Sequence, residues 1–113
     1  MTFTPSYASN APTRGAIDGL PGAVLLEFGT DWCGFCLASA PIIAKALAAY
    51  PGVKHIKVED GSGRALGRSF KVKLWPTLIF LANGKEMARL IRLADGEAVA
   101  QALAAIDPVG SAQ

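Results

Sequence analysis

The chain has 113 residues, 51% of them hydrophobic and 18% charged, a composition too apolar for intrinsic disorder and a length typical of one domain. Eleven basic and nine acidic residues give a formal net charge of +2 without a long run of one sign, which argues against a nucleic-acid-binding surface. The longest charge-free apolar run, residues 32–44, is shorter than the roughly 20 residues of a membrane-spanning helix. We therefore expect one globular domain over residues 1–113, with neither nucleic acid nor a membrane as its partner.

The two ends of the chain carry the weakest structural signals. Residues 1–13 are uncharged and contain two prolines, so they lack the basic start and apolar stretch of a secretory signal. We expect this segment to be weakly structured and residues 108–113 to form a tail. Two cysteines are too few for the disulfide framework of a small secreted domain, which favours a cytoplasmic location.

The first regular elements are a strand and a helix. Residues 22–28 form a nearly continuous apolar run, typical of a central strand buried on both faces, with Glu27 as the exception. Over residues 33–50 the apolar residues no longer alternate, which predicts a helix that contains Pro41 and ends at the Pro-Gly pair 51–52.

The second half of the chain predicts a strand, a short helix and a hairpin. Residues 53–59 alternate in part between apolar and polar, as a strand does, and residues 60–70 suit a loop with a short helix. The apolar segments 77–81 and 85–92 flank an Asn-Gly pair, the strongest short-range signal of an antiparallel hairpin.

A last helix completes the expected fold. Asp95 can cap a helix that runs to about Ile106, with Glu97 in its positive first turn. A strand–helix–strand crossover implies a parallel pair, and the hairpin adds antiparallel strands. The order of elements thus predicts an α/β fold with a mixed central β-sheet flanked by helices.

A C-x-x-C motif lies where the first predicted strand passes into the helix. Cys33 falls near the helix N-terminus and Cys36 one turn inside it, a spacing that lets the two sulfurs meet. Unpaired backbone N–H groups and the helix dipole stabilise a thiolate on Cys33, whereas the deeper Cys36 is harder to ionise. This asymmetry predicts that Cys33 attacks a disulfide and Cys36 resolves the product.

Metal binding is the other use of a C-x-x-C pair. Zinc takes four ligands, and the only histidine, His55, lies on a predicted strand. A closed metal site would need carboxylates or the cysteines of a second chain. We therefore expect redox chemistry with no metal and no organic cofactor, keep a two-chain metal or cluster carrier as an alternative, and assign His55 no role.

Several motifs in order resemble the thioredoxin family over about residues 14–106. They are the acidic residue Glu27 in the first strand, W-C-G-F-C at 32–36, Pro41, Lys57, W-P-T-L-I-F at 75–80 and Asn83-Gly84. The resemblance implies a thioredoxin-like fold and a thiol–disulfide oxidoreductase that acts on protein disulfides. It also implies electrons from a reductase or a small thiol, and we expect a monomer.

The resemblance also assigns residue roles. Pro76 corresponds to the family's cis-proline, which faces the disulfide, and the main chain of Trp75 would bond an extended substrate segment. Glu27 occupies the place of a buried aspartate, where a desolvated carboxyl suits proton exchange with Cys36. The structural alternative is that Glu27 pairs with Lys57 or reaches the edge of the sheet.

Other positions around the motif depart from the family's pattern. Phe35 replaces a proline and restores a backbone N–H at the helix start, which would stabilise the thiolate and make the disulfide more oxidising. Phe35, Leu37 and Trp75 would form an apolar rim, the alternative being that they turn inward and pack in the core. Arg92 stands where glycine is usual, and Trp32 would pack over the site. Such a rim marks partner binding when exposed, so a non-catalytic binding module is the second function that we consider.

Overall fold

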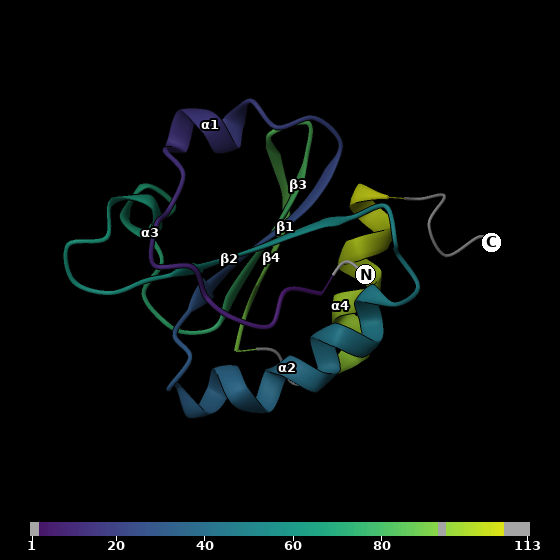
Figure 1. Ribbon diagram of the computed structural model, residues 1–113. Helices are drawn as coiled ribbons and strands as arrows, with labels where there is room; N and C mark the ends of the chain where they lie inside the picture. The colour runs from purple at the N-terminus through teal and green to yellow at the C-terminus, as the bar shows by residue number, and fades with distance from the viewer. Residues whose placement is uncertain (1–2, 93–94, 108–113) are drawn as a thin grey trace.

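The computed structural model describes residues 3–92 and 95–107, which form a four-stranded sheet flanked by four helices (Figure 1). In chain order the elements are α1 (Arg14–Asp18), β1 (Ala23–Gly29), α2 (Gly34–Leu47), β2 (Lys54–Glu59), α3 (Ala65–Ser69), β3 (Thr77–Ala82), β4 (Lys85–Ile91) and α4 (Gly96–Ile106). The strand order is β2–β1–β3–β4, with β1 and β2 parallel and the other neighbours antiparallel. This arrangement confirms the predicted mixed α/β sheet.

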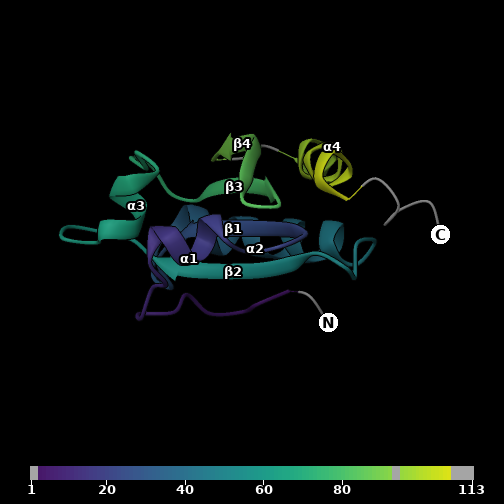
Figure 2. The ribbon, with the colours of Figure 1, turned by 90° about the horizontal axis from the view of Figure 1, so that it is seen from above.

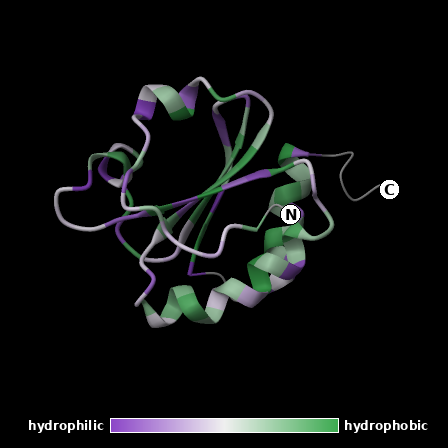
Figure 3. Ribbon diagram, in the orientation of Figure 1, coloured by the Kyte–Doolittle hydropathy of each residue, from purple (hydrophilic) through white to green (hydrophobic). Residues whose placement is uncertain are grey.

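The sheet is buried on both faces because side chains alternate along its central strands. Leu25 of β1 and Phe80 of β3 pack with residues of α2 and α4. Val24 and Leu26 face the other way, into a second cluster that includes residues of α1 and α3. Figure 3 shows hydrophobic colour where the strands cross, as expected for a sheet between two helical layers.

Helix α2 ends earlier than the sequence predicts. It spans Gly34–Leu47, with Pro41 inside it, and turns follow before residue 51. Tyr50 precedes Pro51, and a residue before proline is disfavoured in the helical region, so the last turn of the predicted helix does not form. Asp95 behaves as expected, because its side chain accepts a hydrogen bond from the N–H of Ala98 at 3.1 Å.

The predicted hairpin joins β3 to β4 through Asn83 and Gly84. Both residues have positive φ angles, 50° and 81°, the conformation of a type I′ turn, whose twist matches that of a hairpin. The Asn83 side chain also accepts a hydrogen bond from the N–H of Gly22 at 2.8 Å. The turn is thereby tied to the start of β1.

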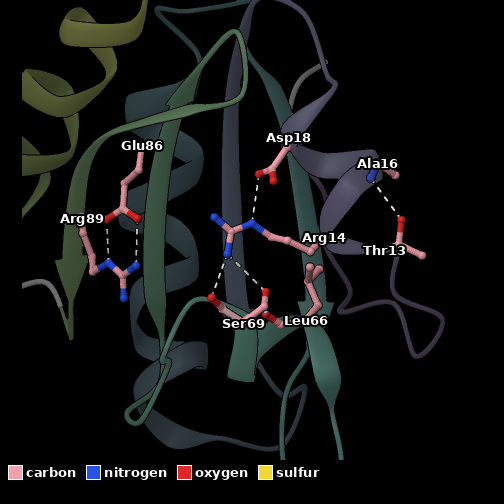
Figure 4. Close-up of polar contacts among 8 residues, drawn as sticks. All are labelled: Thr13, Arg14, Ala16, Asp18, Leu66, Ser69, Glu86 and Arg89. Atoms are coloured by element: carbon pink, nitrogen blue, oxygen red, sulfur yellow. Dashed lines mark hydrogen bonds and ion pairs between the residues drawn. The ribbon is translucent and has the colours of Figure 1, made fainter.

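Polar contacts hold the short helices α1 and α3 together (Figure 4). Arg14 pairs with Asp18 at 2.9 Å and donates a second hydrogen bond to the Ser69 carbonyl at 2.7 Å. Its guanidinium also lies over the Phe70 ring, 3.8 Å from the centroid. One side chain therefore joins two helices that are far apart in the sequence.

The N-terminal segment runs along β2 on the side of the sheet away from β4 (Figure 2). Ala8 forms a parallel bridge to Val58, and the hydroxyl of Thr4 donates to the carbonyl of His55 at 2.8 Å. Because this segment covers the edge of β2, it carries Tyr7 into a buried position. The expected tail at 108–113 and the first two residues lie outside the described part of the chain.

Candidate active site

The two cysteines occupy the start of α2, just after the carboxyl end of β1. Cys33 is the N-cap residue, with extended backbone angles, and Cys36 lies in the first turn of the helix. Both are free thiols, and only 9% of Cys33 and 4% of Cys36 is exposed. The motif therefore stands where the sequence predicts it, with Cys36 the deeper residue.

The environment of Cys33 favours its thiolate. Burial opposes ionisation, but a hydrogen bond from the Cys36 thiol and bonds from the N–H groups of Cys36 and Phe35 outweigh it, assisted by the charge of Arg92. The pKa of Cys33 is therefore lower than that of an ordinary thiol. The Phe35 N–H among these donors is a group that a proline at this position would lack.

The environment of Cys36 favours its protonated form. Burial is the main cause, and a neighbouring Cys33 thiolate adds to it, although hydrogen bonds with the Thr30 backbone and the Tyr7 side chain act in the opposite direction. Together these effects raise the pKa of Cys36 to about 11. Cys36 therefore needs a proton acceptor before it can act as a nucleophile.

A carboxylate lies beneath the cysteines on β1. Glu27 is only 1% exposed, and each of its oxygens meets a donor. Oε1 is 2.8 Å from His55 Nε2, and Oε2 accepts a hydrogen bond from the Tyr7 hydroxyl. Because the N–H of Thr4 donates to His55 Nδ1 at 2.9 Å, the ring proton lies on Nε2 and points at Glu27.

Lys57 does not pair with Glu27, although the two residues are register partners on β1 and β2. The Lys57 ammonium donates to the carbonyl of Pro5 at 3.0 Å and lies 4.2 Å from the centre of the Tyr7 ring. The alternative of a Glu27–Lys57 ion pair is therefore wrong. The sequence patterns of the strands do not place the N-terminal segment, and it is the Pro5 carbonyl of this segment that binds the Lys57 ammonium.

Tyr7 is the residue of this site that the sequence does not reveal. Its hydroxyl is hydrogen-bonded to both Glu27 and Cys36. The nearby Gly29 makes this approach possible, since a Cβ there would lie 2.5 Å from Cys36 Sγ and 2.7 Å from the Tyr7 hydroxyl oxygen. Tyr7 stands in no motif, whereas for His55 one signal exists, because alternation along β2 places it on the same face as Lys57.

A surface beside Cys33 combines cationic, aromatic and main-chain groups. The Trp75–Pro76 bond is cis. Arg92 donates from Nε to the carbonyl of Trp75 at 3.1 Å, and its guanidinium lies 4.1 Å from the centre of the Phe35 ring. Phe35 is 57% exposed, so it does not turn into the core.

The two tryptophans differ in how firmly they are held. Trp75 donates its indole N–H to the buried Asp60 at 2.9 Å, which fixes its ring at the rim of the site. Trp32 leans edge-on against Trp75, with ring centroids 5.9 Å apart, and stays 74% exposed. That Trp32 packs over the site stays a prediction, since the contact of its ring is with Trp75 at the rim.

Metal and membrane features can be assessed over residues 3–92 and 95–107. In that part of the chain, histidine, cysteine, aspartate and glutamate side chains form no group of three that could hold a metal ion. Nor does any helix there combine the length and apolar character needed to cross a bilayer.

Comparisons with known proteins point to one family. The family model described as Thioredoxin matches residues 16–105. The chain is 33% identical to the thioredoxin of Chlamydia trachomatis over 78 residues, which cover 69% of this chain and 76% of that protein. It is 34% identical to thioredoxin-1 of Saccharomyces cerevisiae over 82 residues, 73% of this chain and 79% of the yeast protein.

A solved structure shows the same likeness in three dimensions. Thioredoxin 2 from Pseudomonas aeruginosa, in its reduced form, superposes with a TM-score of 0.81 and is 50% identical in sequence. The likeness covers 89% of this chain and 94% of that one. The fold and the sequence motifs therefore lead to the same family.

Proposed function

Since the chain belongs to the thioredoxin family and is a thiol–disulfide oxidoreductase, we propose that it exchanges disulfides with other proteins through Cys33 and Cys36. The observation that carries this assignment of roles is the opposite ionisation of the two thiols. The pKa of Cys33 is lowered at the N-cap of α2, whereas that of the deeper Cys36 is raised to about 11.

In the first step, the Cys33 thiolate attacks one sulfur of a substrate disulfide. A bond forms between Cys33 and that sulfur, the substrate's own S–S bond breaks, and the other substrate sulfur leaves as a thiolate. A thiolate already formed at neutral pH makes Cys33 the effective nucleophile. Its position at the N-cap leaves it nearer the surface than Cys36.

In the second step, Cys36 loses its proton and attacks Cys33. The Cys33–Cys36 bond forms, the bond from Cys33 to the substrate breaks, and the substrate sulfur leaves with the electron pair. The dithiol is thereby oxidised and the substrate disulfide reduced. Glu27 is the final acceptor of the Cys36 proton, since its carboxylate is buried beneath the pair and joined to it through hydrogen bonds.

The substrate groove would be formed by the rim beside Cys33. We propose that the main chain at Trp75 and Pro76 bonds an extended segment of the substrate, while Phe35 and Trp32 offer apolar contact. Arg92 holds the Trp75 carbonyl in the free protein. A substrate that bonds this carbonyl would therefore displace the Arg92 side chain, which makes Arg92 a residue of substrate selection.

Phe35 would also set the redox properties of the pair. Its N–H donates to Cys33 and contributes to the lowered pKa. A stabilised thiolate makes the reduced form more favourable and the disulfide more oxidising, by about 30 mV for each pKa unit. We therefore propose a protein suited to disulfide exchange as well as reduction.

The cellular partners follow from the same chemistry. Electrons would be returned to the Cys33–Cys36 disulfide by a reductase or a small thiol, with no bound cofactor. We propose that the protein works as a monomer in the cytoplasm, where a reducing pool keeps such a pair in its dithiol form.

Trapping of a mixed disulfide tests the assigned roles. Cys36→Ser removes the resolving thiol, so an oxidised protein substrate should stay attached to Cys33, whereas the matched Cys33→Ser variant should trap far less. Non-reducing electrophoresis and mass spectrometry identify the linked cysteine. Equal trapping by both variants would reject the assignment, and host complementation by the double serine variant would support the binding module instead.

A further inference from the structure

We propose that the Tyr7 hydroxyl relays the proton from Cys36 to Glu27 during the second step. The inference rests on the proposed function, in which Cys36 must lose its proton before it can attack Cys33. The relay supplies the path for that proton. It adds to the reaction a residue from the N-terminal segment, which no motif in the sequence marks.

The contacts of Tyr7 place its hydroxyl between donor and acceptor. The oxygen is hydrogen-bonded to Cys36 on one side and to Glu27 Oε2 on the other. The other carboxylate oxygen, Oε1, is engaged by His55 at 2.8 Å. The phenol is thus the group through which this carboxylate meets the resolving thiol.

The proton transfer balances without charge on the phenol. Before transfer, the Cys36 thiol donates to the Tyr7 oxygen, and the Tyr7 hydroxyl donates to the ionised Glu27. As the Cys36 proton moves to the Tyr7 oxygen, the hydroxyl proton moves to Glu27, and both hydrogen bonds reverse direction. Tyr7 then donates to the new Cys36 thiolate, which attacks Cys33, while the neutral Glu27 keeps the proton until the substrate leaves.

The surroundings of Tyr7 suit a neutral relay. Its burial, and then the negative charge of Glu27, raise the pKa of Tyr7 above that of an ordinary phenol, so the group passes a proton without becoming a phenolate. A hydroxyl can donate one hydrogen bond and accept others at the same time, which is the property that a relay requires.

The other charged neighbours position Tyr7 without bonding its hydroxyl. The Lys57 ammonium lies over the ring face at 4.2 Å, and Asp31 accepts the backbone N–H of Tyr7 at 3.0 Å. His55 faces Glu27, and Cys33 lies in the same small cluster as Tyr7 and Cys36. Asp31 therefore holds the backbone of Tyr7 and Lys57 covers one face of its ring, while the hydroxyl oxygen meets Glu27 and Cys36.

The test measures the rates of the two chemical steps separately in the variant Tyr7→Phe. This substitution removes only the hydroxyl of Tyr7. Reduced protein is mixed with excess 5,5′-dithiobis(2-nitrobenzoate) in a stopped-flow instrument, and the released thionitrobenzoate is followed by absorbance. The first release depends on reagent concentration and reports attack by Cys33. The second is independent of it and reports attack by Cys36. Tyr50→Phe is the matched control, since the Tyr50 hydroxyl bonds the Ala100 carbonyl.

We expect Tyr7→Phe to leave the first rate within about twofold and to slow the second about 100-fold at pH 7, the lower end of general acid–base effects. The second rate of the variant should then rise about tenfold per pH unit, because hydroxide must take the Cys36 proton, while wild type and Tyr50→Phe respond less steeply. A second rate within threefold of wild type, or equal slowing of both steps, would overturn the relay. Absence of both releases in wild type would instead reject the proposed function.

A measurement on the unmodified protein covers the case in which Tyr7→Phe does not fold. The second release is measured in mixtures of light and heavy water. Two protons that move together give a curved dependence of the rate on deuterium fraction, which supports the relay, whereas a linear dependence means one proton in flight and overturns it.

Discussion

Replacement of Gly29 by alanine should disrupt the contact between Cys36 and Tyr7. The new Cβ would lie 2.5 Å from Cys36 Sγ, 2.7 Å from the Tyr7 oxygen and 2.8 Å from Cζ of its ring, against ordinary contacts of 3.4–4 Å. Relief requires a shift approaching 1 Å, which has to come from the two buried side chains, because both backbones are held. Cys36 belongs to α2, and the bridge of Ala8 to Val58 holds the backbone next to Tyr7.

The expected cost of Gly29→Ala is about 1–3 kcal/mol in the free energy of unfolding, typical of an overpacked core. For a domain of this size the midpoint of thermal unfolding should fall by about 4 °C per kcal/mol. Denaturant unfolding of the reduced protein measures the effect. Gly15→Ala is the matched control, because no atom lies within 4 Å of its new Cβ, and a helical alanine should be neutral or stabilising by up to about 1 kcal/mol. If Gly29→Ala were as stable as wild type, the close packing of Gly29, Tyr7 and Cys36 would be refuted.

Two further predictions concern the thiols. Alkylation of the reduced protein, followed by peptide mass spectrometry, should label Cys33 first. Labelling of Cys33 should decline as pH falls through the lowered pKa of this thiol. Cys36, with a pKa of about 11, is ionised in only about one molecule in 10⁴ at pH 7. Faster labelling of Cys36 than of Cys33 would contradict the assigned ionisation. Phe35→Pro should raise the pKa of Cys33 by removing an N–H donor and lower the reduction potential by about 30 mV per unit. Phe35→Ala keeps the donor, so equal shifts in the two variants would exclude this cause.

The elements that local patterns determine were predictable from the sequence. The apolar run of β1, the Asn83-Gly84 turn and the Asp95 cap each depend on a few adjacent residues, and the structure confirms them. The placement of the cysteines is also local, because a strand followed by a helix puts Cys33 at an N-cap. The early end of α2 shows the limit of the pattern, since helical composition continues to Tyr50 while Pro51 disfavours the last turn.

The partners of Glu27 could not be predicted in the same way. His55 and Tyr7 reach Glu27 from 28 and 20 residues away in sequence, and neither stands in a motif. Alternation along β2 places His55 on the face of Lys57, which was the only available signal. For Tyr7 none existed, because the position of the N-terminal segment depends on backbone pairing with the edge of β2.

The placement of the N-terminal segment explains how a glutamate can be buried in this site. Glu27 is buried on a central strand, where an unpartnered carboxylate would be costly, and its register partner Lys57 turns away to Pro5. The segment compensates at both oxygens, because Thr4 fixes the tautomer of His55 for Oε1 and Tyr7 supplies the donor for Oε2. The segment that covers the edge of β2 therefore keeps the buried Glu27 carboxylate hydrogen-bonded and connects it to Cys36 through Tyr7. The ionisation of the two thiols thus depends on residues that precede the first helix.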